Sequence, residues 1–158
     1  MIKETIDSFK GNYLYLSNFA VAYFFDKKGR EWKSTEHYYQ AMKSTDWNDQ
    51  KNIRLAATPY KSKQLGKKVK LRPDWEEVKE AVMMDALLYK FSQNEVLRIR
   101  LLRTGNAMLV EGNTWGDRYW GVCDGKGKNR LGICLMKVRE MFKDGTVMER
   151  YEGKRRYL

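Results

Sequence analysis

Hydrophobic residues recur at helical spacing in the second half of the chain. Between Leu131 and Phe142 they fall at every third or fourth position, which predicts an amphipathic helix. A longer segment opens at Pro73 and reaches roughly Phe91, and its second half is apolar almost all round the helix axis. Such a pattern is typical of a buried central helix. Cys134 lies within the apolar stripe of the last helix, so we predict that it is a core residue.

Capping residues predict further helices. Residues 35–44 follow a hydroxyl cap, and Asp46 starts another short helix. Thr58 and Pro59 suit the cap and the first position of a third, because proline needs no hydrogen-bonded N–H there. A fourth is predicted over 94–103, with an asparagine as its cap.

Aromatic and β-branched runs at 13–19 and 21–25 predict strands. The polar turn 26–29 then returns the chain along a partner strand at 30–33. A short strand is predicted at 108–111, and its last residue is a carboxylate. Together these elements predict an α+β fold that is a single compact domain, mostly helical with a small β-sheet.

Length and composition fit one folded domain. The 158 residues are 42% hydrophobic and 13% aromatic, which predicts a globule with a normal core. We place the domain at 1–142 and a basic C-terminal tail or extension at 143–158, which fits a hairpin and a loose end equally well. No apolar run approaches the ~20 residues of a membrane-spanning helix, and the N-terminus has no secretory pattern. Cys123 and Cys134 are too few for a disulfide framework, so we expect a cytoplasmic protein.

The chain is strongly basic. It has 31 Lys and Arg residues against 20 Asp and Glu residues, a formal net charge of +11. This excess favours anionic partners such as nucleic acid or phosphorylated metabolites. Seven basic residues and no acidic one lie between Lys51 and Lys70. That stretch is either a solvated face or a surface that attracts phosphate groups, and the sequence fits both interpretations.

One predicted helix has a polar face. Four side chains share that face at positions i, i+3, i+4 and i+7: Glu36, Tyr39, Gln40 and Lys43. A carboxylate, a phenol, an amide and an ammonium in a row either face solvent or line a polar pocket. His37 is the only histidine, which excludes a multi-histidine zinc site and a histidine-based triad. We therefore predict no metal, and interpret His37 as a packing or hydrogen-bonding neighbour of Glu36.

A second cluster lies in a predicted loop. Residues 111–121 combine two carboxylates with three large aromatic residues, and sites tend to lie on such loops. The glycine-rich stretch 125–132 then leads into the last helix. Glycines allow close backbone approach, the helix start has free N–H groups, and Lys126, Lys128 and Arg130 add positive charge. These features predict a phosphate cradle, although neither a Walker loop nor a dinucleotide fingerprint is present.

Several short motifs follow one another along most of the chain. They are SNF at 17–19, EHYYQAMK at 36–43, KF at 90–91, LVEGN at 109–113, WGD at 115–117, WG at 120–121, GKNRLG at 127–132 and LMKVR at 135–139. Through these motifs residues 9–142 resemble the NADAR (YbiA-like) family. The resemblance implies an α+β N-glycosidase that needs no metal or other cofactor. The substrates it implies are ribosylated aminopyrimidine phosphates of early riboflavin synthesis, and ADP-ribose attached to guanine, including in DNA.

The resemblance and the residue types together suggest site roles. Cleavage of an N-glycosidic bond builds positive charge on the sugar, which carboxylates near C1′ stabilise. We assign water activation to Glu36, sugar orientation or proton transfer to Asp117 and support to Glu111, and these roles could be exchanged. We expect the three to share a cavity. The candidate substrate-binding residues are Asn18, Gln40, Lys43, Trp115, Trp120, Gly121, Lys126, Lys128, Asn129 and Arg130.

The expected partner is a phosphorylated ribosyl or ADP-ribosyl small molecule, or ADP-ribosylated nucleic acid. The alternative is a non-catalytic module that binds ADP-ribose or nucleic acid. Acidic residues among the aromatics argue against it, because they repel a phosphate backbone. A hydrolase that removes ADP-ribose from protein is a third possibility.

Overall fold

The computed structural model describes residues 3–147 and 149–152. They divide into two compact units. Among the described residues, the first unit takes 3–17 and 95–147, and the second takes 18–94 and 149–152. No helix in this part of the chain is both long and apolar enough to cross a lipid bilayer.

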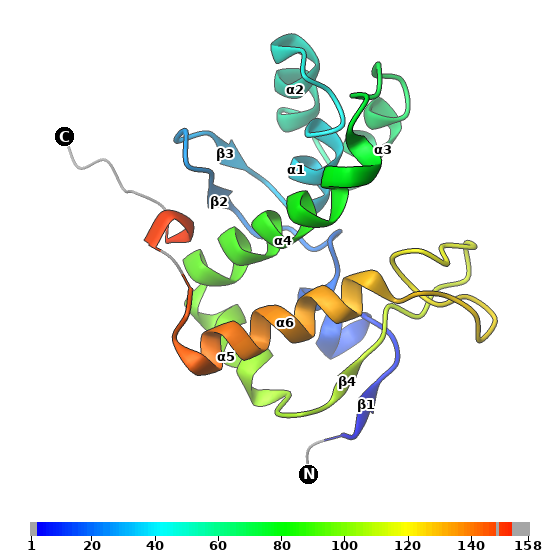
Figure 1. Cartoon of the computed structure of the whole chain (residues 1–158), viewed down its shortest axis with the longest axis vertical. Coiled ribbons are helices and arrows are strands. Elements are labelled where there is room, and N and C mark those ends of the chain that lie inside the picture. Colours follow the sequence, from blue (N-terminus) through cyan, green and yellow to red (C-terminus); the bar gives the residue numbers. More distant parts are fainter. Residues whose placement is uncertain (1–2, 148, 153–158) are drawn as a thin grey trace. The chain divides into compact units, whose positions relative to one another are not determined.

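The first unit joins the N-terminal segment to the last third of the chain (Figure 1). Its elements are β1 (Thr5–Ile6), the 3-10 helix η1 (Gly11–Leu16), α5 (Glu95–Arg103), β4 (Met108–Leu109) and α6 (Arg130–Asp144). Strands β1 and β4 pair in parallel, with Thr5 opposite Met108 and Ile6 opposite Leu109. Helix α6 packs against β4 and α5. A long irregular excursion, coloured yellow in Figure 1, connects β4 to α6.

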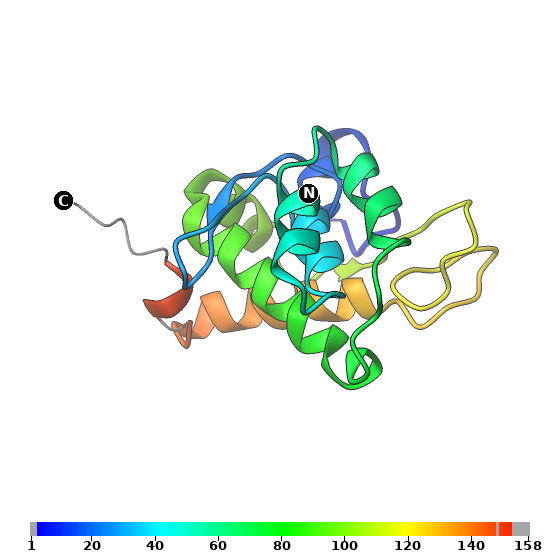
Figure 2. The same cartoon turned by 90° about the horizontal axis from the view of Figure 1, so that it is seen from above.

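The second unit is a group of helices beside a small hairpin. Its elements are β2 (Phe24–Phe25), β3 (Glu31–Trp32), α1 (Thr35–Ala41), α2 (Trp47–Arg54), α3 (Pro59–Gly66), α4 (Trp75–Gln93) and the 3-10 helix η2 (Glu149–Tyr151). Helix α1 packs against α2, α3 and α4 (Figure 2). All seven of its residues are buried. The short α1 is therefore the centre of this unit.

The predicted hairpin is confirmed, although its ladder is short. Phe24 pairs with Trp32 and Phe25 with Glu31 in antiparallel register. The Asp26 carboxylate accepts the N–H groups of Lys28 and Arg30 in the turn and the Trp32 indole N–H at 3.0 Å. One buried carboxylate thus fixes both the turn and the large side chain that follows it.

The predicted strand at 13–19 is wrong. Residues Gly11–Leu16 form a 3-10 helix, which buries Tyr15 and Leu16 and leaves Leu14 51% exposed. The alternation of aromatic and aliphatic residues looked like a strand, but all four residues 13–16 are apolar and so define no face. Gly11 starts the helix at φ 57°, a left-handed conformation that glycine adopts without strain.

The remaining elements largely follow the sequence prediction, and the α+β class is confirmed. Ser34, Asp46 and Thr58 cap α1, α2 and α3 through side-chain oxygens. Helix α4 begins at Trp75 rather than at Pro73, and its residues from Ala86 to Phe91 are all buried. Cys134 is 2% exposed, as its place in the apolar stripe of α6 predicts.

The described end of the C-terminal extension packs on α4. Tyr151 is 3% exposed, its hydroxyl donates to Asp85 and its ring lies 5.1 Å from that of Tyr89. Gln93 donates to the Tyr151 carbonyl oxygen at 3.0 Å. Residues 149–152 are therefore not loose, while 148 and 153–158, including the basic run predicted there, lie outside the described residues.

Candidate active site

The first turn of α1 places a carboxylate in the interior of the second unit. Ser34 is the cap, and its hydroxyl accepts the backbone N–H of His37 at 3.2 Å. Glu36 follows in the first turn, where the helix dipole favours a negative charge. Its side chain is only 6% exposed. Such burial is rare for a glutamate unless it has polar partners.

Gln40 is one of those partners. Its Nε2 donates to Glu36 Oε1 at 2.7 Å, across one turn of the helix. Its own Oε1 is buried and has no hydrogen-bond partner among the residues that the structure describes. A Cβ added to Gly66 of α3 would lie 2.0 Å from that oxygen, so only glycine leaves Gln40 this space. The predicted pairing of Glu36 and Gln40 on one face is present, and the face is buried.

Asn18 lies next to the same carboxylate-bearing turn. Its backbone oxygen accepts the Glu36 N–H at 3.1 Å. Its side-chain Nδ2 contacts the Met83 sulfur at 3.6 Å, and its Oδ1 is buried without a hydrogen-bond partner in the described part of the chain. The Thr35 hydroxyl oxygen is also buried without a hydrogen-bond partner among the described residues. Three buried oxygens around one turn thus have no hydrogen-bond partner among the described residues, although buried polar atoms are nearly always paired.

His37 has a structural role. Its Nε2 lies 3.0 Å from the Ala56 carbonyl oxygen, which can only accept, so this nitrogen carries the proton. Nδ1 then accepts from the Ser34 hydroxyl at 2.7 Å. Burial lowers the pKa of this imidazole, which agrees with a neutral ring. These hydrogen bonds go to Ser34 and Ala56, so a direct contact between His37 and Glu36 stays a prediction.

Two lysines add titratable groups to this unit. Burial lowers the pKa of Lys43, while the Glu36 carboxylate acts in the opposite direction, and its ammonium lies 5.4 Å from the Tyr39 ring centre. Lys90 on α4 is fully buried, and burial lowers its pKa to about 7. Its ammonium lies 5.2 Å from the Phe91 ring centre. The sequence analysis gave Lys90 no role, although a lysine within the apolar half of a helix indicates that an ammonium group is buried there.

In the first unit, Asn113 and Asp117 hold the loop 111–121 together. The Asn113 amide donates to the Asp117 carbonyl oxygen at 2.8 Å and accepts its N–H at 3.0 Å. Asp117 Oδ1 in turn accepts the N–H groups of Tyr119 and Trp120, at 3.1 and 2.9 Å. One oxygen of this predicted catalytic carboxylate is therefore engaged in shaping the loop.

Glu111 is held in place through its backbone. The Asn129 Oδ1 accepts the Glu111 N–H at 3.0 Å, and the Asn129 Nδ2 donates to the Leu109 carbonyl at 2.8 Å. Both polar atoms of the Asn129 amide are thus hydrogen-bonded to the backbone at the end of β4. A Cβ on Gly121 would lie 2.2 Å from the Glu111 carbonyl oxygen, so Gly121 permits this close approach. The structure shows Asn129 and Gly121 as residues that position Glu111.

The predicted cradle of free backbone N–H groups at the start of α6 is wrong. The N–H groups of Lys128, Arg130 and Leu131 donate to carbonyl oxygens of Arg118, Tyr119 and Trp120, at 2.8, 3.0 and 3.0 Å. The Asn129 N–H donates to the Gly121 carbonyl at 3.3 Å. The irregular segment between β4 and α6 folds back on the start of α6, and its carbonyl oxygens accept these N–H groups. The spacing of glycines in the sequence does not show this.

The remaining candidates of this loop lie mostly in solvent. Trp115 is 59% exposed, and Lys126 and Lys128 are also exposed. Trp120 is partly buried, with its ring edge-on to Tyr119 at 4.9 Å. Arg130 is also partly buried, and contact of these side chains with substrate stays a prediction.

The basic stretch between Lys51 and Lys70 covers α2 and α3, where most of its lysines are exposed. Lys51 lies 5.1 Å from the ring centre of the exposed Trp47. In the described residues, no group of three or more His, Cys, Asp or Glu side chains is arranged to hold a metal ion.

The structure thus brings Asn18, Glu36, Gln40 and Lys43 together in the second unit. It brings Glu111, Asp117, Gly121 and Asn129 together in the first. Gly66 and Thr35 belong to the Glu36 site and were missed, because their contribution depends on the packing of α3 and on burial. A cavity shared by the three carboxylates stays a prediction.

Comparisons with known proteins give the same family as the motifs. The family model described as NADAR domain matches residues 7–143. The chain is 42% identical over 146 residues to the N-glycosidase YbiA of Escherichia coli (strain K12), which spans 89% of this chain and 90% of that protein. It is 44% identical over 115 residues to the N-glycosidase Npun_R5314 of Nostoc punctiforme, over 69% and 73% of the two chains.

A solved structure agrees at the level of the fold. The NMR structure of the E. coli protein YbiA superposes with a TM-score of 0.81 at 39% sequence identity. The match covers 94% of this chain and 91% of that one.

Proposed function

Since the chain belongs to the NADAR family, we propose that it hydrolyses the N-glycosidic bond between a phosphoribose or ADP-ribose and a nitrogenous base. The broader class of activity, hydrolysis of an N-glycosyl compound, is the one for which its relatives are named. In the reaction, water adds to C1′, the C1′–N bond breaks, and the base leaves with a proton in place of the sugar.

The observation that supports this proposal most is the buried Glu36 carboxylate with the buried side-chain oxygens beside it. Glu36 is 6% exposed and is oriented by Gln40 at 2.7 Å. The Gln40 and Asn18 side-chain oxygens beside it are buried and have no partner among the described residues. A ribose offers hydroxyl donors for both oxygens. A sugar ring bound there would lie within reach of the carboxylate.

Glu36 is assigned to the attacking water. A carboxylate in a buried site can accept a proton from water and stabilise the positive charge that builds on the sugar ring. The bond from Gln40 to Oε1 fixes the orientation in which the carboxylate meets that water. Lys43, two residues after the end of α1, is assigned to a phosphate group of the substrate, because its partly buried ammonium is a compact positive charge.

Asp117 and Glu111 are assigned to sugar orientation and support, as their motifs suggest. The loop contacts described above leave Asp117 Oδ2 to act on a ligand, since Oδ1 already holds two backbone N–H groups. Asn129 and Gly121 contribute by positioning the segment that carries Glu111. The base itself is assigned to stacking on Trp115 or Trp120.

The experiment is incubation of the purified protein, in the presence of a chelator, with two substrates. One is a ribosylated aminopyrimidine phosphate and the other is DNA carrying ADP-ribosylated guanine. Release of free base, followed by chromatography, is expected from one of them and names the substrate class. Tight binding of both without release would show the non-catalytic binder instead. Release of ADP-ribose from a modified protein but from neither base would show the third alternative.

A further inference from the structure

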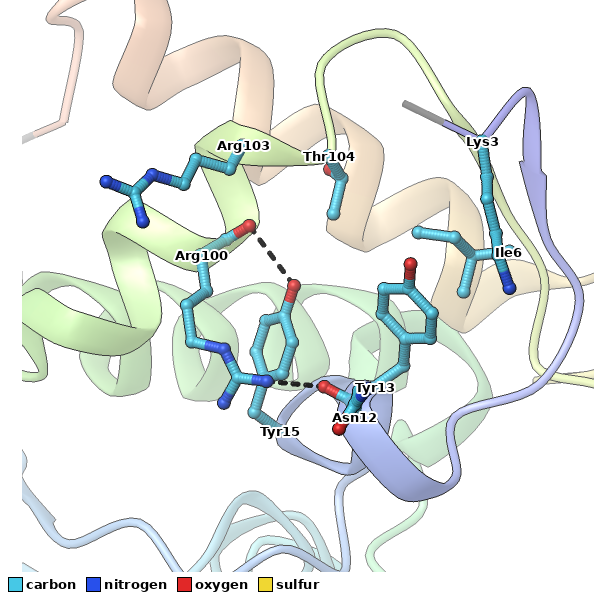
Figure 3. Close-up of a pocket in the computed structure, with 8 residues that line it drawn as sticks. All are labelled: Lys3, Ile6, Asn12, Tyr13, Tyr15, Arg100, Arg103 and Thr104. Carbon is cyan, nitrogen blue, oxygen red and sulfur yellow. Dashed lines mark hydrogen bonds between the residues drawn. The ribbon is translucent and has the colours of Figure 1, made fainter. Parts of the chain in front are cut away.

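A separate pocket lies within the first unit, at the N-terminal segment and the end of α5 (Figure 3). Its volume is about 320 Å³. The residues that line it are Lys3, Ile6, Asn12, Tyr13, Tyr15, Arg100, Arg103 and Thr104. The residues assigned above to the N-glycosidase site are not among them. The pocket therefore needs an explanation of its own.

Arg100 is held rigidly at the pocket wall. Its guanidinium carbon lies 4.1 Å from the Tyr15 ring centre, and its Nη2 donates to the backbone oxygen of Asn12. The Tyr15 hydroxyl donates back to the Arg100 carbonyl oxygen at 3.1 Å, so the two residues tie η1 to α5 (Figure 3). A guanidinium fixed in this way loses little conformational entropy when it binds an oxyanion, and its other N–H groups are suited to bidentate contact.

Two further cations border the pocket. Lys3 approaches from the N-terminal side, where its ammonium lies 5.5 Å from the Tyr13 ring centre. Arg103 is one turn beyond Arg100 on α5 and is exposed, so its side chain can rotate toward a ligand. Among the lining residues that the structure describes, three are cationic and none is acidic.

The position of Arg100 and Arg103 in the last turn of α5 offers a simpler explanation for these two charges. The negative end of the helix dipole stabilises cations there. That explanation does not cover Lys3, which comes from a different segment. Nor does it cover the polar floor, where Thr104 is buried and its Oγ1 accepts a bond from the buried Arg139 at 2.9 Å. Like charges gathered at one concave site repel each other unless an anion joins them.

We propose that this pocket binds the phosphoryl group of a small phosphate ester. Three cations, two tyrosines and the Asn12 side chain suit a compact polar anion. The volume lies at the lower end of the range for small-molecule pockets, so it holds more than a bare oxyanion. This inference does not depend on the N-glycosidase activity proposed above.

Titration of the 15N-labelled protein, followed by backbone amide shifts, tests the pocket. Ribose 5-phosphate, inorganic phosphate and unphosphorylated ribose are the three ligands. Saturable shifts are expected at Asn12, Tyr13 and Thr104 with both phosphates and none there with ribose. Tighter binding of the ester identifies an ester as the ligand, and equal binding identifies the free anion.

The variants include one pair matched in charge, R103Q at the pocket and its control R98Q. K3Q with R103Q together should weaken the affinity of the pocket for ribose 5-phosphate by about tenfold or more, since two charge-assisted contacts are lost. R100Q should also weaken the affinity for ribose 5-phosphate. Because this variant loses the contacts of Arg100 to Tyr15 and Asn12 as well, its melting temperature is measured to detect a loss of stability. R98Q removes one charge from the same helix away from the pocket and should change the affinity less than about twofold.

Absence of saturable shifts at these amides, or equal weakening by R98Q and by R103Q alone, would overturn the proposal. Base release is measured in a different assay. A protein that binds phosphate here but releases no base refutes only the N-glycosidase proposal, and the reverse result refutes only this one.

Discussion

Gly66 and Gln40 are in such close contact that no other residue fits at Gly66 without displacing the glutamine amide. A Cβ at that position would lie 2.0 Å from Gln40 Oε1 and 3.0 Å from Gln40 Cβ. The amide is the group that orients Glu36. A glycine on α3 therefore controls a carboxylate on α1 without touching it.

The first prediction follows from this contact. In G66A the Gln40 side chain must move, and its bond to Glu36 is lost. Because alanine also favours a helix by about 1 kcal/mol, the melting temperature should change little. Base release should nevertheless fall by about tenfold, a usual scale for a displaced positioning group. The control is K67A, the next residue, which is exposed. Full activity in G66A would mean that Gln40 does not position the catalytic carboxylate.

Replacing the carboxylate itself tests the assignment of Glu36. E36Q keeps the shape of the side chain and can still accept the bond from Gln40, so the fold should persist. Turnover should drop by about a hundredfold or more, because the group that accepts the proton of water is gone. Circular dichroism and single-turnover base release are the measurements. A variant with unchanged turnover would remove Glu36 from the mechanism.

Asp117 allows charge and structure to be separated. D117N retains Oδ1, which accepts the Tyr119 and Trp120 N–H groups, whereas D117A loses both bonds. If the charge acts on the sugar, D117N should lose turnover by about a hundredfold with an unchanged melting temperature. D117A should lose stability as well, by roughly 1–3 kcal/mol for two unsatisfied donors. Normal turnover in D117N together with an unstable D117A would assign the residue to loop structure alone.

Lys90 should make stability depend on pH. Its pKa is lowered to about 7 in the folded protein by burial, while in the unfolded chain it is near its ordinary value of 10.5. Between these values the unfolded state binds the extra proton, so stability should rise with pH from 7 to 9.5, by at most about 1.4 kcal/mol per unit. In K90M this contribution should vanish. Urea unfolding of both proteins at several pH values measures the difference, and parallel profiles would show that Lys90 is not held neutral.

Helix caps were the most predictable part of this fold. Ser34, Asp46 and Thr58 accept hydrogen bonds from backbone N–H groups only three residues away, so a short stretch of sequence is enough to predict them. The stretch 13–16 gave no comparable signal. Its four apolar residues fit a strand and a 3-10 helix alike, and contacts with distant residues such as Arg100 decide between them.

The types of residue in the site could be predicted from the sequence, but the hydrogen bonds that they make could not. The pairing of Glu36 with Gln40 follows from helical spacing. That both amide atoms of Asn129 bond to the backbone could not be known, because the partners come from a segment about twenty residues earlier. The burial of Lys90 likewise depends on what packs around α4, and its sequence neighbours give only a hint.

The contact of Tyr151 with α4 has a consequence for the order in which the protein is made. The second unit begins at residue 18, but its packing includes the ring of residue 151, which is synthesised after the whole of the first unit. While the ribosome is still translating, Tyr89 and Asp85 must wait without this partner. The face of α4 that carries Tyr89 and Asp85 is therefore covered only once residue 151 has emerged from the exit tunnel.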